Sequence, residues 1–237
     1  MEFDVILQPD VRALFLEGLG NTLFLLFLSL LFGGVLAVPL AVLRVSRKRW
    51  VSGPIWLYTY VFRGTPMLIQ LYLIYYGIAQ LQFVQDHWDT VAVLAPFKNA
   101  VFCTVLAFAL NTCAYTIEML ASAIRETPSG EVEAARAMGM SRGQIMRRIV
   151  LPSAMRRCLP AYSNEVIMML QGTSVASTVP AVMDLTGAAR SVYSDFYLPF
   201  EAFITAGLFY LLLTFAFVGV FKWLENRFLA HLRARTH

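Results

Sequence analysis

Long apolar stretches recur along the chain and are separated by short polar segments. Leu19–Leu43 contains 25 residues without a charge, and Ala202–Phe221 contains 20. Three more stretches, 54–81, 99–124 and 159–183, carry one charged residue each. About 20 apolar helical residues cross the hydrocarbon core of a membrane. The pattern therefore predicts an all-α membrane protein with five transmembrane helices, at 19–43, 54–81, 99–124, 159–183 and 202–221.

The basic residues gather at alternate ends of these stretches. Arg44 and 47–49 directly follow the first stretch, seven arginines lie within 125–158, and four lysines or arginines follow Phe221. Lysine and arginine are enriched in cytoplasmic loops. The N-terminus is therefore expected outside and the C-terminus inside, with 82–98 and the polar segment 184–201 as external connections.

Composition supports a membrane bundle and excludes several other classes. Of the 237 residues, 58% are hydrophobic and 14% charged, and the mean hydropathy is +0.63. This is more apolar than an ordinary soluble domain and excludes a disordered chain. The net charge of +4 follows membrane topology and is not taken as a sign of nucleic-acid binding. Residues 1–237 are expected to form one domain, with three cysteines that have neither metal-ligand nor disulfide-framework spacing.

The segment 127–152 predicts two short helices joined by a glycine turn. Thr127 and Pro128 indicate a helix start, and Gly139 is placed to end that helix in a left-handed conformation. Ser141 and Gln144 match a capping box for the second helix. That helix is expected to run to about Val150 and to be stopped by Leu151 and Pro152. The hairpin is either a surface-lying amphipathic element without a partner or a docking element for a cytoplasmic protein.

The same segment carries a family resemblance. Its pattern of Glu-Ala-Ala, a glycine four residues later and Ile-x-Leu-Pro after nine more resembles the "EAA" loop of ABC importer permeases, members of binding-protein-dependent transport systems. In that family the loop couples the permease to an ATPase. The resemblance assigns this role to Glu133, Ala134, Ala135, Gly139, Ile149, Leu151 and Pro152.

Three other stretches resemble the polar amino-acid branch of this family: 62–66, 114–118 and 160–165. The likeness is greatest to the M-type permeases of histidine/lysine/arginine/ornithine importers, through the run 110–116. It implies the type I ABC importer permease fold, with a midplane solute pocket built from the third to fifth spans. The resemblance suggests Glu165 as a ligand for a cationic solute. Neutral hydrogen bonds could come from Asn111, Tyr115, Gln171, Thr173 and Ser174, for each of which helix–helix contact is the commoner role.

Three ionisable residues fall inside the apolar stretches and need partners or water. Arg63, Glu118 and Glu165 lie at similar depth, about 9–14 Å from the inner ends of their stretches at roughly 1.5 Å per residue. They could therefore form a structural cluster in which Arg63 neutralises one carboxylate. Pro66 is expected to kink the second stretch or to begin its main helical part after a short interfacial helix.

The chain carries no phosphate-binding loop, metalloprotease motif or nucleophile elbow, so no catalytic residue, metal ligand or resident cofactor is expected. The resemblance implies that ATP and Mg are bound by a partner. The implied partners are a second homologous permease subunit, two copies of an ABC ATPase, a periplasmic amino-acid-binding protein, the amino-acid substrate and membrane lipid. The implied location is the bacterial inner membrane, as a multi-pass protein.

The sequence leaves three functions open. The first is a permease subunit that imports basic amino acids by alternating access, with glutamine or glutamate as the alternative substrate. The second is an ion-coupled secondary carrier that works alone, although such carriers usually show internal repeats. The third is a membrane scaffold without transport, for which a buried acid such as Glu165 would have little use.

Overall fold

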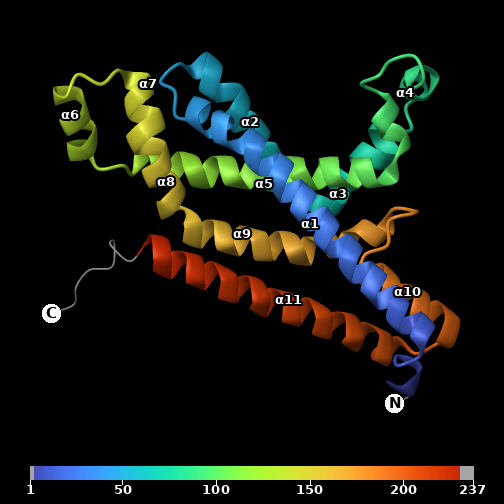
Figure 1. The fold of residues 1–237 in the computed structure, drawn as a ribbon. Coiled ribbons are helices and arrows are strands. Elements are labelled where there is room, and N and C mark those ends of the chain that lie inside the picture. Colours follow the sequence, from blue (N-terminus) through green and yellow to red (C-terminus); the bar gives the residue numbers. More distant parts are fainter. Residues whose placement is uncertain (1–2, 230–237) are drawn as a thin grey trace.

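The computed structural model describes residues 3–229, which form an all-helical bundle (Figure 1). Three of its helices are long and apolar enough to cross a membrane: α1, α5 and α11. They confirm the first, third and fifth predicted stretches as long apolar helices: α1 and α11 extend beyond theirs, and α5 matches its stretch to within one residue. The elements are α1 (Pro9–Arg44), α2 (Arg49–Gly64), α3 (Met67–Tyr72), α4 (Gln82–His87), α5 (Ala100–Arg125), α6 (Ser129–Ala137), α7 (Arg142–Ile145), α8 (Leu151–Arg157), α9 (Leu159–Gly172), α10 (Leu185–Phe196) and α11 (Pro199–Phe228).

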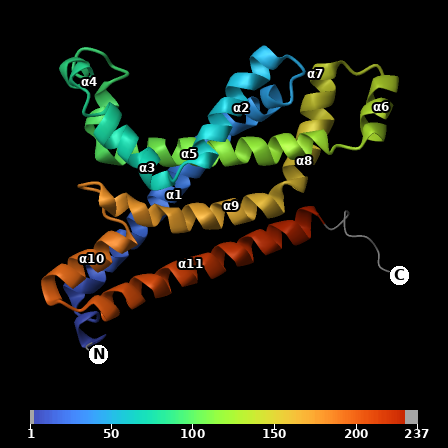
Figure 2. The same cartoon turned by 180° about the vertical axis from the view of Figure 1, so that it is seen from behind.

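Helix α1 crosses the molecule diagonally and joins its two ends. At about 1.5 Å per residue its 36 residues span about 54 Å. Figures 1 and 2 show that one end lies beside α10 and the other approaches α2 and α7. Between these ends α1 packs against α5, the most deeply buried of the three long apolar helices. A Cβ on Gly33 would lie 2.5 Å from Thr112 Cγ2 and 2.8 Å from the Ala109 carbonyl oxygen, so the two backbones approach closely there.

The second predicted stretch is not one helix. Helix α2 ends at Gly64, Thr65 and Pro66 are extended, and α3 starts at Met67 and continues as a π-helical segment to Ile78. Pro66 has no N–H and disfavours helical geometry at Thr65, so it separates two helices. Of the two readings of Pro66, the structure shows a second helix beginning after a separate first one.

The helix in the fourth predicted stretch, 159–183, is shorter than expected. Helix α9 ends at Gly172, a 3₁₀ helix follows over Thr173–Thr178, and the chain then turns through Ala181 with φ of 63°. The predicted polar connection 184–201 contains α10. The buried Asp184 side chain accepts hydrogen bonds from the N–H groups of Thr186 and Gly187 and so caps this helix.

The hairpin predicted in the cytoplasmic segment is present as α6 and α7. Gly139 has φ of +79°, and Ser141 and Gln144 form the capping box. The apolar side chains of α7 and its continuation pack on the ends of α1 and α5: Ile145 and Val150 are buried, and Met146 and Ile149 lie against them. The predicted hairpin, the left-handed Gly139 and the Ser141–Gln144 capping box are therefore confirmed.

Two details of the hairpin prediction are wrong. Thr127 does not cap α6, because its hydroxyl accepts a hydrogen bond from Arg157 instead. Pro152 does not stop the helix, because the chain stays helical through α8 to Arg157. Met146–Val150 forms a π-helical segment just before the proline. The missing Pro152 N–H is accommodated by this π-helical segment, which changes the hydrogen-bond register of the helix just before the proline.

The α1–α5 contact can be tested with two alanine substitutions in one helix. Gly33→Ala is expected to lower the melting temperature of the detergent-solubilised protein, because its Cβ meets α5 backbone and Thr112. Gly20→Ala is the matched control, since nothing lies within 4 Å of its Cβ. It is expected to be neutral or stabilising by up to about 1 kcal/mol through helix propensity. Equal melting temperatures for the two variants would contradict the close α1–α5 packing.

Candidate solute cavity and cytoplasmic hairpin

A cavity of about 210 Å³ lies where the α2–α3 break meets α5 and α9. It contains three predicted pathway residues, Asn111, Tyr115 and Glu165, and the predicted structural residue Pro66. Four further lining residues were not predicted: Thr65, Met67, Met168 and Met169. The missed residues are one threonine and three methionines, types that do not by themselves indicate a binding site. Only the α2–α3 break brings Thr65 and Met67 to this cavity.

Glu165 is the acidic residue of this cavity. Its side chain is 6% exposed. Among residues 3–229 it takes part in no ion pair, since the pairs found there join Arg44 to Glu118 and Lys98 to Asp89. Methionine side chains form much of the wall around it, and they are flexible and polarisable. A buried carboxylate in such surroundings favours a cationic partner.

Asn111 and Tyr115 lie one turn apart on α5; Asn111 reaches Gln70 in α3, and Tyr115 reaches Arg63 at the end of α2. Asn111 Nδ2 donates to Gln70 Oε1 at 2.9 Å, and the Tyr115 hydroxyl donates to the Arg63 carbonyl oxygen at 3.4 Å. The Arg63 guanidinium lies 5.4 Å from the centre of the Tyr115 ring, which is cation–π distance. These contacts fix the α2–α3 break against α5.

Three predicted pathway residues do not line the cavity. Gln171 is exposed, Ser174 is half-buried, and the Thr173 hydroxyl donates to the Leu170 carbonyl oxygen at 2.6 Å. Thr173 therefore serves the local backbone, as expected of a hydroxyl in an apolar helix. The three residues lie at or beyond the end of α9, where the chain changes to a 3₁₀ helix.

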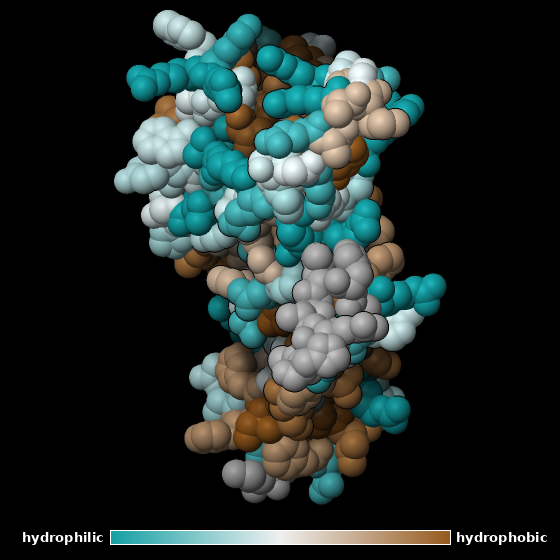
Figure 3. All heavy atoms as spheres, turned by 90° about the vertical axis from the view of Figure 1, so that its left-hand side faces the viewer, coloured by the Kyte–Doolittle hydropathy of each residue, from teal (hydrophilic) through white to brown (hydrophobic). Residues whose placement is uncertain are grey.

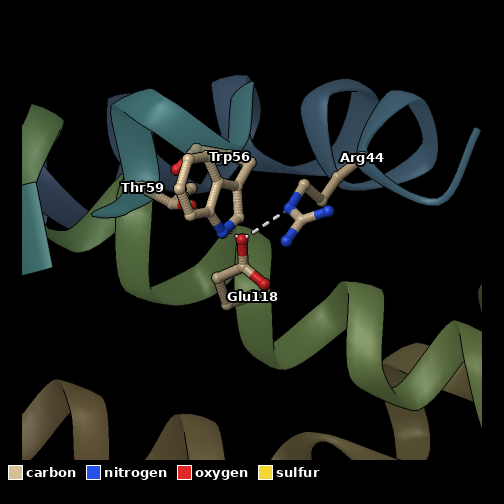
Figure 4. Close-up of polar contacts among 4 residues, drawn as sticks. All are labelled: Arg44, Trp56, Thr59 and Glu118. Atoms are coloured by element: carbon tan, nitrogen blue, oxygen red, sulfur yellow. Dashed lines mark hydrogen bonds and ion pairs between the residues drawn. The ribbon is translucent and has the colours of Figure 1, made fainter. Parts of the chain in front are cut away.

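The cation beside Glu118 is Arg44 and not Arg63. Arg44 Nε and Glu118 Oε1 are 2.7 Å apart, and the Thr59 hydroxyl donates to the same oxygen at 2.7 Å (Figure 4). The predicted neutralisation of one carboxylate by Arg63 is not seen as an ion pair among the described residues: α2 ends in the Thr65–Pro66 break, and the Arg63 guanidinium lies against the Tyr115 ring. The Arg44–Glu118 ion pair joins α1 to α5, and the Thr59 hydrogen bond joins α2 to the same carboxylate.

The hairpin presents a hydrophilic surface at one end of the bundle. Figure 3 shows hydrophilic residues gathered over this end and hydrophobic residues further down the same face. Of the motif residues, Glu133, Ala134 and Gly139 are exposed, whereas Ala135 is 4% exposed and packs inward. The remaining motif residues are half-buried where the hairpin meets α1 and α5: Ile149, Leu151 and Pro152.

Arg157 fastens the hairpin to α5, and sequence reasoning missed it by counting it only as a topological charge. Its Nη2 donates to the Ala123 carbonyl oxygen at 2.9 Å and to the Thr127 hydroxyl at 2.8 Å. Ala123 lies in the last turns of α5, so Arg157 satisfies a carbonyl near the helix end. The end of α8 is thereby tied to the start of the hairpin.

Comparison with known proteins identifies the family. Residues 29–230 match the family model described as "Binding-protein-dependent transport system inner membrane component". The chain belongs to this family. It is 48% identical over 93% of its length to the histidine/lysine/arginine/ornithine transport system permease protein HisM of Escherichia coli K12, covering 91% of that protein. It is 44% identical to the nopaline transport system permease protein NocM of Agrobacterium fabrum, over 99% of this chain and 95% of the relative.

Solved structures show the same fold. An amino acid ABC transporter crystallised with histidines matches with a TM-score of 0.80 at 30% identity, over 96% of this chain and 99% of the other. The MetNI methionine ABC transporter in an inward-facing conformation matches with a TM-score of 0.76 at 20% identity, over 93% and 98%. The chain therefore has the ABC importer permease fold, in agreement with the EAA-like motif.

Matched arginine substitutions test which cation stabilises Glu118. Arg44→Met is expected to cost about 1–3 kcal/mol of unfolding free energy, because a largely buried carboxylate loses its ion pair. Arg63→Met is expected to cost less, since only a cation–π contact is lost. Thermal melting of the solubilised protein compares the two variants. A larger loss for Arg63→Met would contradict the Arg44–Glu118 assignment.

Proposed function

We propose that this chain is the transmembrane permease subunit of an ATP-driven, binding-protein-dependent importer of basic amino acids. Family membership and the likeness to the E. coli HisM permease support the importer. The observation that carries the substrate class is Glu165, a buried acid without an ion pair in the described chain, on the wall of a cavity. A cationic side chain would supply the charge that this carboxylate lacks.

The chain is a single multi-pass domain of the inner membrane in this proposal, with five spans, the N-terminus outside and the C-terminus inside. Helices α1, α5 and α11 are the continuous spans. Helix α3 with its extension to Ile78, and α9 with its 3₁₀ continuation, are the two interrupted ones. Interrupted helices in membranes are tolerated where they line a cavity, which is where the α2–α3 break lies.

The hairpin is the coupling element of the proposed importer. Its exposed motif residues and the 84% exposed Met138 at its tip would dock on an ATPase subunit. Two ATPase copies, which bind ATP and Mg, would act on this chain and on a second, homologous permease in a heterodimer. A periplasmic binding protein would deliver the amino acid, and this chain itself would hold no cofactor and catalyse no reaction.

Transport would proceed by alternating access. Movement of the hairpin would reach the cavity through α8 and α9, because α8 is tied to α5 by Arg157 and leads directly into α9. Glu165 on α9 would attract the ammonium or guanidinium of the solute. The methionines would accept its aliphatic stem, and their flexibility suits side chains of different length.

Other substrates and mechanisms predict different behaviour. Glutamine and glutamate carry no cationic side chain, so only their α-ammonium groups could interact favourably with Glu165. A secondary carrier would need no binding protein, and membership of a binding-protein-dependent family argues against it.

Uptake into proteoliposomes tests the proposed function. The vesicles contain this chain with its second permease and ATPase, and receive the binding protein and labelled arginine outside, with or without ATP inside. ATP-dependent uptake that histidine, lysine and ornithine inhibit, but glutamine and glutamate do not, is the expected result. Uptake without ATP would contradict the importer. Inhibition by glutamine or glutamate alone would contradict the substrate class.

Glu165→Gln is expected to raise the KM for arginine by roughly tenfold or more, the loss of one charge-assisted hydrogen bond. Uptake of any neutral amino acid that the complex accepts should change much less. Glu17→Gln is the matched control, because Glu17 is an exposed acid of α1. Equal effects of Glu165→Gln on cationic and neutral solutes would show that Glu165 is structural.

Gly139→Val is expected to uncouple the ATPase while leaving the permease inserted. A β-branched residue at φ of +79° is strained by about 1–2 kcal/mol or more, so the hairpin would lose its turn. Binding-protein-stimulated ATP hydrolysis and uptake are measured together. Gly53→Val is the control, since Gly53 has helical φ and nothing within 4 Å of its Cβ. Normal ATP-driven uptake by Gly139→Val would refute the coupling role of the hairpin.

A further inference from the structure

The break between α2 and α3 leaves backbone carbonyls of α2 without helical partners. Pro66 supplies no N–H, and the extended Thr65 ends the helical hydrogen bonding of α2. The last carbonyl oxygens of a helix need donors from elsewhere. An unsatisfied carbonyl at membrane depth costs several kcal/mol. A side chain that donates to these carbonyls therefore stabilises the break.

Gln70 is the side chain that does so. It is 5% exposed and lies in the first turns of α3. Its Nε2 donates to the Phe62 carbonyl oxygen at 2.7 Å, to the Thr65 carbonyl oxygen at 3.0 Å and to the Thr65 hydroxyl at 2.8 Å. One amide nitrogen thus donates both to the last turn of α2 and to Thr65 in the break, and its orientation is fixed because carbonyl oxygens accept only from donors.

The fixed orientation of the Gln70 amide also determines how Asn111, a residue of the cavity wall, is oriented. Since the Gln70 nitrogen faces the break, Gln70 Oε1 faces α5 and accepts from Asn111 Nδ2 at 2.9 Å. The Asn111 NH₂ group must therefore point toward Gln70, so Oδ1, the other polar atom of this amide, points away from Gln70. Asn111 lines the cavity that also contains Glu165.

We propose that Gln70 is a positioning residue of the solute site: it turns the Asn111 amide so that an oxygen, and not an NH₂, faces a protonated amine or guanidinium in the cavity. The inference rests on the proposed function. Gln70 itself does not line the cavity and acts only through Asn111. An Asn111 free to rotate would present its NH₂ part of the time and repel the cation.

A double-mutant cycle on arginine uptake tests this assignment. The reconstituted complex with its binding protein carries Gln70→Met, Asn111→Leu or both, and the KM and maximal rate are measured separately. Gln70→Met is expected to raise the KM about tenfold, and the double variant is expected to be no worse than Asn111→Leu alone. Non-additivity marks two residues that act as one unit. A purely structural Gln70 would lower the maximal rate and give additive effects.

Two controls keep the test decisive. Gln82→Met makes the same substitution at an exposed position of α4 and should leave the KM unchanged. If Gln70→Met does not assemble by size-exclusion chromatography, Gln70→Glu replaces it. A protonated carboxyl keeps one donor for the break and one acceptor for Asn111, so a KM within threefold of wild type is expected, and a tenfold rise would overturn the proposal.

The outcomes separate this inference from the proposed function. Absence of ATP-dependent arginine uptake by the wild-type complex would overturn the proposed function and this inference with it. Wild-type uptake with an unchanged KM in either single variant, or with additive effects in the double variant, would overturn the positioning role alone.

Discussion

The close approach of α1 to its neighbours is the constraint on which the rest of the structure depends. At Gly33 there is no room for a side chain between α1 and the α5 backbone. Near the other end, a Cβ on Gly18 would lie 2.9 Å from the Asp184 carbonyl oxygen, at the start of α10. Two hydrogen bonds reinforce this end, from the Asn21 amide to the Met183 carbonyl oxygen and from the Leu185 N–H to the Thr22 hydroxyl. Helix α1 therefore holds α5 and α10 in one frame.

The hairpin and the cavity are attached to this frame at different points. The hairpin packs on Ala41 of α1 and on the last turns of α5, and the Arg44–Glu118 ion pair closes the same end. The cavity lies further along α5, between the α2–α3 break and α9. Packed helices, and not a flexible loop, therefore connect the hairpin to the cavity. This arrangement suits a permease whose energy comes from a partner on the cytoplasmic side.

Local signals in the sequence were sufficient where structure depends on neighbouring residues. The positive φ of Gly139, the Ser141–Gln144 capping box and the three long apolar helices follow from residue type and spacing. The errors arose where distant segments decide. Arg63 matches Glu118 in depth along the chain, yet the ion-pair partner is Arg44 at the end of α1, which only the packing of α1 against α5 reveals. Helix α10 and the role of Gln70 depend on contacts with α1 and α5, which no spacing along the chain reveals.

The claim that α1 joins the hairpin and the far end into one frame can be measured by electron spin resonance. Spin labels are placed at Arg148 and Tyr197, which are exposed at opposite ends of the frame. The half-buried Cys158 is replaced by serine, and Cys103 and Cys113 are buried. The distance between the two labels is recorded in the reconstituted complex without nucleotide and with ATP trapped. The account predicts the same distance in both states, because the chain moves as one body against its partner permease. A change in the distance on ATP binding would show that the chain bends internally and would contradict the account.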